Sequence, residues 1–482
     1  MYERECFFID GAWQRPASGE RLPVHSPASE QAIGFAPRAS APDALAAVAA
    51  ARRAFESGPW PRMAPAERAD FLVAIAEHLK THRRALAELS VDESGVPITY
   101  AHQRENGPVA IFEYYARLAR EFPFAENRAS GTGRALVLRE PVGVVAAIVP
   151  FNGPLMSAAA KIAPSLAAGC PIVFKPAPET PLSAFAVADA AEAVGLPPGV
   201  LNIVPADRDV GEQLVAHPDV DRVVFTGSSA GGRRVAELCA PGFKRVTLEL
   251  GGKAAAILLP DAPLERSLAQ ILPLSFFNSG QACIALSRIL APRARYDEVV
   301  EAVVDHARRL VVGDPRDEKT QQGPLISARQ RARVLALSAA GRAEGAVLAC
   351  GGGMPSGLPR GHYVEPTVFR DVDNAMRIAQ EEAFGPLLCV IPYRDEAEAV
   401  AIANDTPYGL SGAVFTEDVA RGIAVAERIA VGTFGVNGYA LDPSLPFGGR
   451  KQSGIGREFG FEGLAEYTEV KAIALPVGYA HA

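Results

Sequence analysis

A polar loop around Cys283 is the segment of this sequence best suited to nucleophilic chemistry. Residues 276–283 read Phe-Phe-Asn-Ser-Gly-Gln-Ala-Cys, and the cysteine follows a glycine turn at the expected end of a helix. A cysteine that only fills a core needs no Asn, Ser or Gln beside it. The loop therefore suits a thiol presented to a cavity. Because a free thiol has a pKa of about 8.5, such a nucleophile needs local activation.

Two further side chains could assist that thiol. Glu249 lies between two leucines and precedes Gly251 and Gly252. Burial there would raise its pKa toward the range of a general base. Asn152 stands between Pro150 and Pro154 at the end of an expected strand, where its amide could donate to an oxyanion. Taken alone, Glu249 could be an acid at a strand end and Asn152 a turn former.

A second group of residues could bind phosphate and ribose. Phe225 ends an expected strand, and Gly227 and Ser228 lead into a helix. That arrangement directs backbone N–H groups and a helix N-terminus at an anion. The spacing is not GxGxxG, so an ordinary turn is equally compatible with this segment alone. Lys175 follows another expected strand, where open α/β sheets bind ligands.

Composition narrows the class of protein. The chain has 482 residues, 49% of them hydrophobic and 21% charged, and a net charge of −7. This length favours two or three structural units. The acidic balance argues against nucleic acid as a partner. No apolar run long enough to span a membrane and no signal-peptide pattern is present. The six cysteines are scattered and the histidines form no metal motif. We expect reduced thiols, no metal and a cytoplasmic location.

Hydrophobic periodicity predicts alternating strands and helices. A short strand pair opens the chain, followed by helices from residue 43, from 65 through 79, over 86–93 and over 109–120, and a strand over 134–140. The first α/β series has strands at 142–149, 171–174, 201–204 and 223–225, with helices at 155–168, 183–194, 210–216 and 230–240. A second series runs through 254–259, 264–277, 287–291, 296–310, 328–341, 387–393, 397–403, 412–415 and 419–429, and a strand covers 467–475. This rhythm predicts doubly wound, mostly parallel sheets.

In combination, these motifs resemble the aldehyde dehydrogenase superfamily. The resemblance runs from residues 8–11 with Trp13 to residues 467–471. Its most specific parts are residues 248–253, 277–283 and 381–386, and the segment 446–458. The resemblance implies an aldehyde-dehydrogenase-like α/β fold. Its parts would be a Rossmann-type cofactor domain over about 1–117 and 140–251, a catalytic domain over 252–465, and oligomerisation strands over 118–139 and 466–482.

The resemblance also implies a covalent cycle. The thiolate of Cys283 attacks the aldehyde, while the amide of Asn152 and the backbone N–H of Cys283 hold the oxyanion. Hydride transfer then gives a thioester, and Glu249 activates the water that releases the acid. Lys161 and Glu458 match residues linked to a proton route for that glutamate.

By the same resemblance, a set of residues would contact the cofactor. Ser228 and Gly211 would meet the pyrophosphate, Lys175 the adenosine ribose, and Glu382 and Phe384 the nicotinamide ribose. The remaining expected cofactor contacts are Val149, Pro150, Phe151, Phe225, Gly227 and Leu250.

Two positions depart from the common family pattern. Phe151 stands where the family usually has Trp. A phenylalanine at this position is also seen in the branch of the family that passes the acyl group to coenzyme A. That branch typically lacks the base, so the presence of Glu249 favours hydrolysis. The NAD-selecting acid would fall at Pro178, and Glu179 comes one residue later. We expect NAD, with NADP left open. A non-catalytic member of the fold would have lost Cys283 or Glu249.

Small side chains after Asn152 bear on the substrate. Gly153, Ser157 and Ala160 occupy positions that are often bulky in the family. They predict a wide approach to the thiol and a bulky, apolar or aromatic aldehyde. The expected substrate contacts are Gly153, Ser157, Ala160, Phe277, Ala282 and Ile284. The unpaired C-terminal strand predicts a homodimer or homotetramer.

Overall fold

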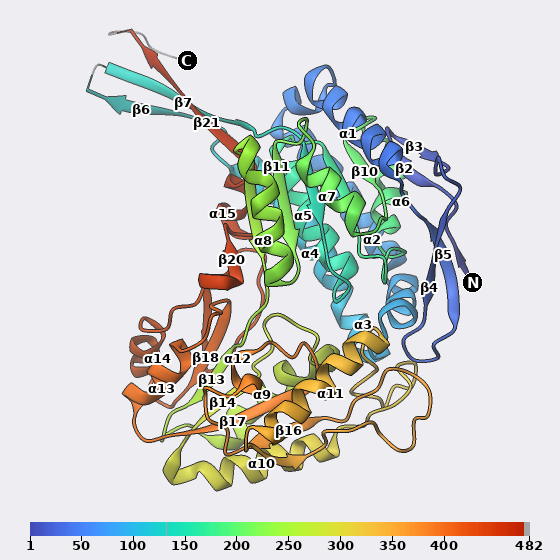
Figure 1. The fold of residues 1–482 in the computed structure, drawn as a ribbon. Helices are drawn as coiled ribbons and strands as arrows, with labels where there is room; N and C mark the ends of the chain where they lie inside the picture. The colour runs from blue at the N-terminus through green and yellow to red at the C-terminus, as the bar shows by residue number, and fades with distance from the viewer. Residues whose placement is uncertain (132, 477–482) are drawn as a thin grey trace.

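The computed structural model describes residues 1–131 and 133–476. They form two α/β parts, each with its own sheet, and a projecting arm; the two parts are called the upper and the lower layer after their place in the view (Figure 1). The upper sheet has the strand order β20-β12-β11-β8-β9-β10-β2-β3. Its strands are β2 (Phe7–Ile9), β3 (Ala12–Gln14), β8 (Val145–Ile148), β9 (Ile172–Lys175), β10 (Leu201–Ile203), β11 (Arg222–Thr226), β12 (Arg245–Glu249) and β20 (Gly454–Ile455). The five strands from β12 to β10 are parallel, so their carboxyl ends meet along one edge.

Helices cover both faces of the upper sheet because successive strand residues point to opposite sides. Val145 and Ala147 pack on one side and Ala146 on the other. The first side meets α2 (Pro65–Ser94), α4 (Asn106–Glu121), α5 (Pro154–Ala168) and α6 (Phe185–Ala193). The second meets α1 (Ala41–Glu56), α7 (Arg208–Ala216) and α8 (Ser229–Cys239).

The lower sheet has the order β15-β16-β17-β14-β13-β18-β19 and is parallel except at β15. Its strands are β13 (Ala255–Leu258), β14 (Arg288–Pro292), β15 (Val347–Cys350), β16 (Thr367–Arg370), β17 (Leu387–Tyr393), β18 (Ser411–Phe415) and β19 (Thr433–Val436). The helices of this part are α9 (Leu264–Phe276), α10 (Tyr296–Arg309), α11 (Ala328–Ala343), α12 (Arg377–Gln380), α13 (Glu396–Asn404) and α14 (Val419–Ala426). The doubly wound fold expected from the periodicity is confirmed.

The arm is a three-stranded antiparallel sheet with the order β21-β7-β6. It consists of β6 (Ala125–Ser130), β7 (Gly133–Pro141) and β21 (Thr468–Leu475), and it extends away from both layers (Figure 1). A second small sheet, β1-β5-β4, lies near the N-terminus and consists of β1 (Tyr2–Glu3), β4 (Arg21–His25) and β5 (Ala32–Pro37). Short α3 (Ile98–Arg104) and α15 (Gly460–Ala465) complete the helices used below.

The expected break between two helices was wrong, and two of the expected domain limits do not coincide with the ends of elements or sheets. The helices expected at 65–79 and 86–93 are one helix, α2, because residues 80–85 contain neither Gly nor Pro and their exposed polar side chains continue the same helix. Residues 118–121, expected to begin the arm, belong to α4. The segment assigned to the catalytic domain contains β20, which pairs with β12 of the upper sheet. Residue 132 and residues 477–482 of the expected arm lie outside the described residues.

Among the described residues, no helix is both long enough and apolar enough to cross a membrane.

Candidate active site

Cys283 follows α9 through a strained turn. Asn278, Ser279 and Gly280 all adopt left-handed backbone, with φ of 49°, 57° and 70°. This conformation costs about 1–2 kcal/mol for each residue that carries a Cβ, so the surrounding contacts must hold it. Ser279 Oγ donates to Gly323 O at 2.8 Å. The turn thus directs the chain after α9 back toward the upper layer, and Cys283 is half-buried.

The environment of the thiol keeps it protonated in the free protein. Burial raises the pKa of Cys283 to about 12, and the charges of Glu382 and Glu249 act in the same direction. Lys161 and the backbone N–H of Cys283 itself oppose this rise in pKa. The cysteine identified in the sequence is therefore surrounded by the groups expected to serve it, although its thiolate is disfavoured in this structure.

Asn152 lies between β8 and α5, beside the cysteine loop. Its side-chain Nδ2 donates to Gln281 O at 3.1 Å. Its backbone carbonyl accepts from Asn278 Nδ2 at 3.0 Å and from Arg104 Nη1 at 3.5 Å. The structure therefore joins the expected oxyanion donor to the loop that carries the nucleophile.

Glu249 ends β12 and is 3% exposed. Burial raises the pKa of its carboxyl well above the usual value, and Glu458 raises it further. Neither carboxyl oxygen has a hydrogen-bond partner among the described residues. A buried carboxyl with a raised pKa and free oxygens can accept a proton from water.

Lys161 and Glu458 form a buried ion pair beside Glu249. Lys161 Nζ lies 2.8 Å from one oxygen of Glu458 and 3.0 Å from the other. The two residues are 297 positions apart in the sequence. Lys161 lowers the pKa of Glu249 while Glu458 raises it, so the two members of the pair act on the expected base in opposite directions.

A cavity of about 450 Å³ opens at the carboxyl edge of the upper sheet. From β8 the sheet continues on one side with β9 and then β10, and on the other side with β11 and then β12. This reversal of strand order is where open α/β sheets bind their ligands. The cavity is lined by Ile148, Lys175, Pro178, Glu179, Arg208, Gly211, Glu212, Val215, Phe225, Ser228, Ala230, Gly231, Arg234, Val235, Leu238 and Arg329.

Four expected cofactor residues meet in this cavity, namely Lys175, Gly211, Phe225 and Ser228. Ser228 caps α8, with Oγ accepting from Gly231 N at 3.2 Å. A Cβ on Gly211 would lie 3.0 Å from Lys175 Cε, so the two residues adjoin. Burial lowers the pKa of Lys175 to about 8.

The other expected cofactor residues lie around this edge. A Cβ on Gly227 would lie 2.5 Å from the Phe225 ring, and the Leu250 side chain covers Gly232. The rings of Phe151 and Phe384 meet edge to face at 5.8 Å. Glu382 Oε1 accepts from Gly252 N at 3.0 Å. Val149 is buried at the end of β8, and Pro150 follows it, half-buried.

The expected substrate residues form two groups that differ in burial. Gly153, Ser157 and Phe277 are half-buried, whereas Ala160, Ala282 and Ile284 belong to the hydrophobic core. A Cβ on Gly153 would lie 3.7 Å from Met156 Cβ, which is ordinary contact.

Sequence reasoning missed several neighbours of the thiol. Tyr439 follows β19 through the Asn437-Gly438 turn, and the charges of Cys283 and Glu249 raise the pKa of its hydroxyl beyond the effect of burial. Tyr100 of α3 packs edge to face on Phe277 at 5.7 Å. The strand β19 before Tyr439 was not predicted, and the turn dipeptide Asn437-Gly438 is the signal that could have indicated it. The helix α3, which begins after Pro97, was not predicted either.

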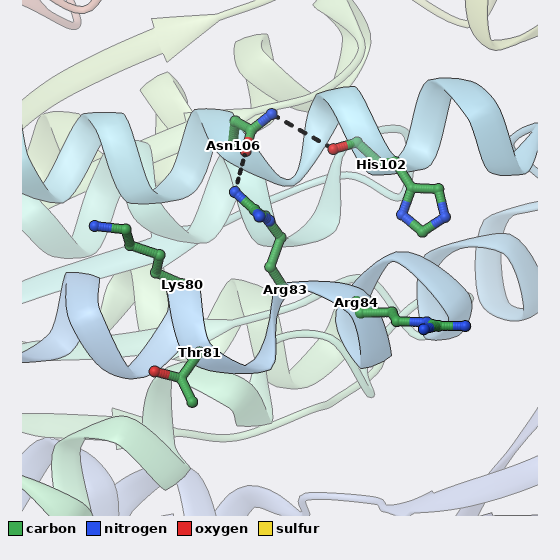
Figure 2. Close-up of a pocket in the computed structure, with 6 residues that line it drawn as sticks. All are labelled: Lys80, Thr81, Arg83, Arg84, His102 and Asn106. Carbon is green, nitrogen blue, oxygen red and sulfur yellow. Dashed lines mark hydrogen bonds between the residues drawn. The ribbon is translucent and has the colours of Figure 1, made fainter.

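A basic pocket lies on the outer side of the same region. A space of about 550 Å³ is lined there by six residues. Figure 2 shows these residues, which are Lys80, Thr81, Arg83, Arg84, His102 and Asn106. Arg83 Nη1 donates to Asn106 Oδ1 at 2.9 Å. Tyr100 and Arg104 on α3 face the catalytic centre, whereas His102 is exposed to solvent. This pocket is therefore separate from the candidate active site.

The chain thus combines a cleft at the carboxyl edge of a doubly wound sheet with a cysteine, an amide and a buried carboxyl nearby, and this combination fits a dehydrogenase. Residues 13–473 match the model of the aldehyde dehydrogenase family. The chain belongs to this family.

Proteins of known sequence and structure agree with this membership. Geranial dehydrogenase of Castellaniella defragrans is 45% identical over 475 residues, which cover 98% of this chain and 99% of that protein. 3-Succinoylsemialdehyde-pyridine dehydrogenase of a Pseudomonas species is 42% identical, with 98% and 99% covered. The structure of a Mycobacterium tuberculosis aldehyde dehydrogenase complexed with NAD+ is 48% identical, has a TM-score of 0.98 and covers 99% of each chain.

Proposed function

We propose that this enzyme oxidises a bulky, apolar or aromatic aldehyde to the carboxylic acid and passes the hydride to NAD. In this cycle Cys283 is the nucleophile, Asn152 and the Cys283 N–H are the oxyanion donors, and Glu249 is the base. The observation that carries the proposal is the juxtaposition of Asn152 with the cysteine loop, through the bond from Asn152 Nδ2 to Gln281 O at 3.1 Å. NAD itself would supply the hydride acceptor.

Lys161 and Glu458 complete the proposed cycle. Once Glu249 has taken a proton from water, that proton must leave before the next turnover. The Lys161–Glu458 pair is buried and electrostatically linked to Glu249. We assign it the role of receiving this proton.

The size of the proposed substrate follows from the small side chains near the thiol. Gly153 and Ser157 are half-buried, and Met156, Phe277 and Tyr439 add apolar surface at the edge of the same core as Cys283. A relative, geranial dehydrogenase, is named for a long apolar aldehyde. These observations favour a bulky apolar aldehyde over a small or charged one.

Gly153→Leu should narrow the approach without unfolding the protein. The φ of Gly153, −157°, lies outside the left-handed region that favours glycine, and its Cβ position makes only ordinary contacts. We expect kcat/KM for benzaldehyde or geranial to fall about tenfold or more, while that for acetaldehyde changes less than about threefold. Acetaldehyde serves as the internal control. Wild-type enzyme that prefers acetaldehyde, or a uniform loss in the variant, would contradict the proposal.

The preference for NAD is argued from charges in the cavity. Glu179 lines the cavity beside Lys175, and its charge raises the pKa of that lysine. The three arginines are already paired: Arg208 and Arg234 with Glu212, and Arg329 with Glu179. A 2′-phosphate would thus meet a carboxylate and no free guanidinium.

Glu179→Gln should relax this preference. We expect the ratio of kcat/KM for NADP to that for NAD to rise about tenfold, because a repulsion worth about 1.4 kcal/mol is removed. Steady-state kinetics with both cofactors measure this ratio. Glu237→Gln is the matched control, since Glu237 also pairs with an arginine, Arg234, but stands outside the cavity lining. An equal ratio in the two variants would contradict the role of Glu179.

We further propose that the arm joins copies of this chain. In the described residues β21 and β6 each pair only with β7, so both outer edges are open. Val470 is 65% and Ile473 39% exposed. Open strands with apolar side chains suit pairing with another chain. A homodimer or homotetramer results, and light scattering distinguishes the two.

We also propose a cytoplasmic location, with an aldehyde as the only partner besides the cofactor and further copies of the chain. All six cysteines are free thiols, which suits a reducing compartment. Localisation of a tagged full chain by cell fractionation tests this assignment.

A further inference from the structure

The side-chain amide of Asn278 connects the two halves of the candidate oxyanion site. Its Nδ2 donates to Asn152 O at 3.0 Å and to Gln281 O at 3.1 Å. Gln281 O also accepts from Asn152 Nδ2 at 3.1 Å. The amides of Asn152 and Asn278 and the carbonyls of Asn152 and Gln281 therefore form one closed set of contacts next to Cys283.

These contacts leave one N–H group of the Asn152 side-chain amide available. A primary amide carries two N–H groups, and one of those on Asn152 is directed at Gln281 O. The carbonyl of Asn152 is held at the same time by Asn278. With its backbone and one N–H fixed, the second N–H of Asn152 has a defined direction and can serve an oxyanion.

The backbone of Asn278 explains why an asparagine stands there. Its φ of 49° and ψ of 34° are left-handed, a region that Asn tolerates better than other residues with a Cβ. Gln281 returns a bond, with Nε2 donating to Asn278 O at 3.1 Å. Gln281 Oε1 in turn accepts from Ile326 N at 3.0 Å, outside the loop. Asn278 is 6% exposed, so water does not readily replace these contacts.

We propose that Asn278 is a positioning residue for aldehyde oxidation: its amide fixes Asn152 and the loop bearing Cys283 at one mutual geometry. This role rests on the proposed function, in which those two residues act on the aldehyde. A displacement of about 1 Å between a nucleophile and its oxyanion donor is enough to slow a reaction about a hundredfold. Asn278 acts through Asn152 and does not touch the aldehyde.

Two substitutions test the role of the Asn278 amide separately from that of its left-handed backbone. Asn278→Gly removes the amide and accepts the left-handed φ without strain. Asn278→Asp keeps the shape and turns an acceptor toward two carbonyl oxygens. In both variants we expect kcat per active site, counted from the NADH burst, to fall about ten- to a hundredfold. KM for NAD should change less than about threefold, because Asn278 is absent from the cavity lining.

Ser279→Gly is the matched control. Ser279 adopts the same left-handed backbone in the same turn, is equally buried, and donates one side-chain hydrogen bond, to Gly323 O rather than to the oxyanion site. Its kcat should stay within about threefold of wild type. A decrease equal to that of Asn278→Gly would show that any loosening of the turn suffices, and would overturn the positioning role.

A double-mutant cycle gives a second readout that general destabilisation would not produce. Asn278→Gly should lower kcat by a smaller factor in the Asn152→Ala background than in the wild type, because the side-chain amide whose direction it fixes is already gone. Full additivity of the two losses would overturn the proposal.

The rate at which iodoacetamide alkylates Cys283 gives a readout that is independent of the proposed function. It is measured by mass spectrometry of the peptide that contains Cys283, without aldehyde or cofactor. Release of the loop should expose the thiol and speed alkylation at least about fivefold in Asn278→Gly but not in Ser279→Gly. Faster alkylation in an enzyme that oxidises no aldehyde would overturn the proposed function while the geometry holds. Unchanged alkylation with unchanged kcat would overturn the role of Asn278.

Discussion

Cys283→Ala should abolish aldehyde-dependent NADH formation, lowering kcat/KM by at least about 10⁴-fold. Without the sulfur no thiohemiacetal forms, and hydride transfer from a free aldehyde or its hydrate lacks the covalent step that the site is built to support. Asn152 and Glu249 would remain in place but would have no intermediate to act on. The rate of NADH appearance with a saturating aldehyde measures the effect.

The other thiols supply the control for this substitution. Cys350→Ala should retain activity within about threefold, since Cys350 is a half-buried thiol on β15 in the lower sheet. Aldehyde oxidation that survives in Cys283→Ala but is lost in Cys350→Ala would show that the wrong thiol has been assigned.

The pH dependence of the same thiol follows from its environment. Burial raises the pKa of Cys283 to about 12 in the free protein, so the neutral form dominates throughout the physiological range. The reactive thiolate fraction must therefore grow with pH, about tenfold per unit, up to the highest pH the fold tolerates. Alkylation rates of Cys283 measured in the absence of NAD between about pH 7 and 10 should rise without a plateau. A plateau near neutrality would show that the free enzyme already holds a thiolate.

Glu249→Gln should produce one NADH per active site and then stall. The thiol and the oxyanion donors are intact in this variant, so addition and hydride transfer proceed. The amide cannot accept a proton from water, and the thioester accumulates. We expect a burst of about one equivalent followed by a steady rate about 10²- to 10⁴-fold below wild type. Stopped-flow absorbance measures the burst, and mass spectrometry of the acid-quenched protein identifies the acyl group on Cys283.

Coenzyme A distinguishes this mechanism from the acylating alternative. If the thioester is normally passed to coenzyme A, adding it should restore turnover in Glu249→Gln and stimulate the wild type. We expect neither effect, because a buried carboxyl with two free oxygens and the Lys161–Glu458 pair beside it suit proton transfer from water. A variant without a burst would instead place Glu249 before hydride transfer and contradict its role in hydrolysis.

Local pattern was sufficient for much of the fold. The two doubly wound sheets were predicted from the alternation of strands and helices. The strands were recognised by branched apolar residues, and the helices by their periodicity and by a Gly at the end or a Pro at the start. The same reasoning failed where signals were absent or misleading. An exposed polar stretch at residues 80–85 suggested a break in α2, and β6 and α3 have too little apolar surface of their own to be recognised.

The candidate site was predicted as a set of residue types and completed by contacts between distant segments. Cys283, Glu249 and Asn152 were recognisable because each stands among neighbours unusual for a packing residue. The same neighbours gave no sign that Glu458 comes back to Lys161, since that pair joins α5 to a segment that enters the upper sheet only through β20. Tyr439, after the end of β19, likewise comes close enough for the charge of Cys283 to raise its pKa.

The sequence by itself determined the chemistry available to this protein: a thiol in a polar loop, a carboxyl between apolar neighbours, an amide after a strand and a glycine turn before a helix. These are local properties, set by covalent neighbours and by hydrophobic period. Only the tertiary structure decided how those groups act on one another. The raised pKa of Cys283, the free oxygens of Glu249 and the hydrogen bonds that join Asn152 to Asn278 and Gln281 all depend on packing against residues far away in the chain.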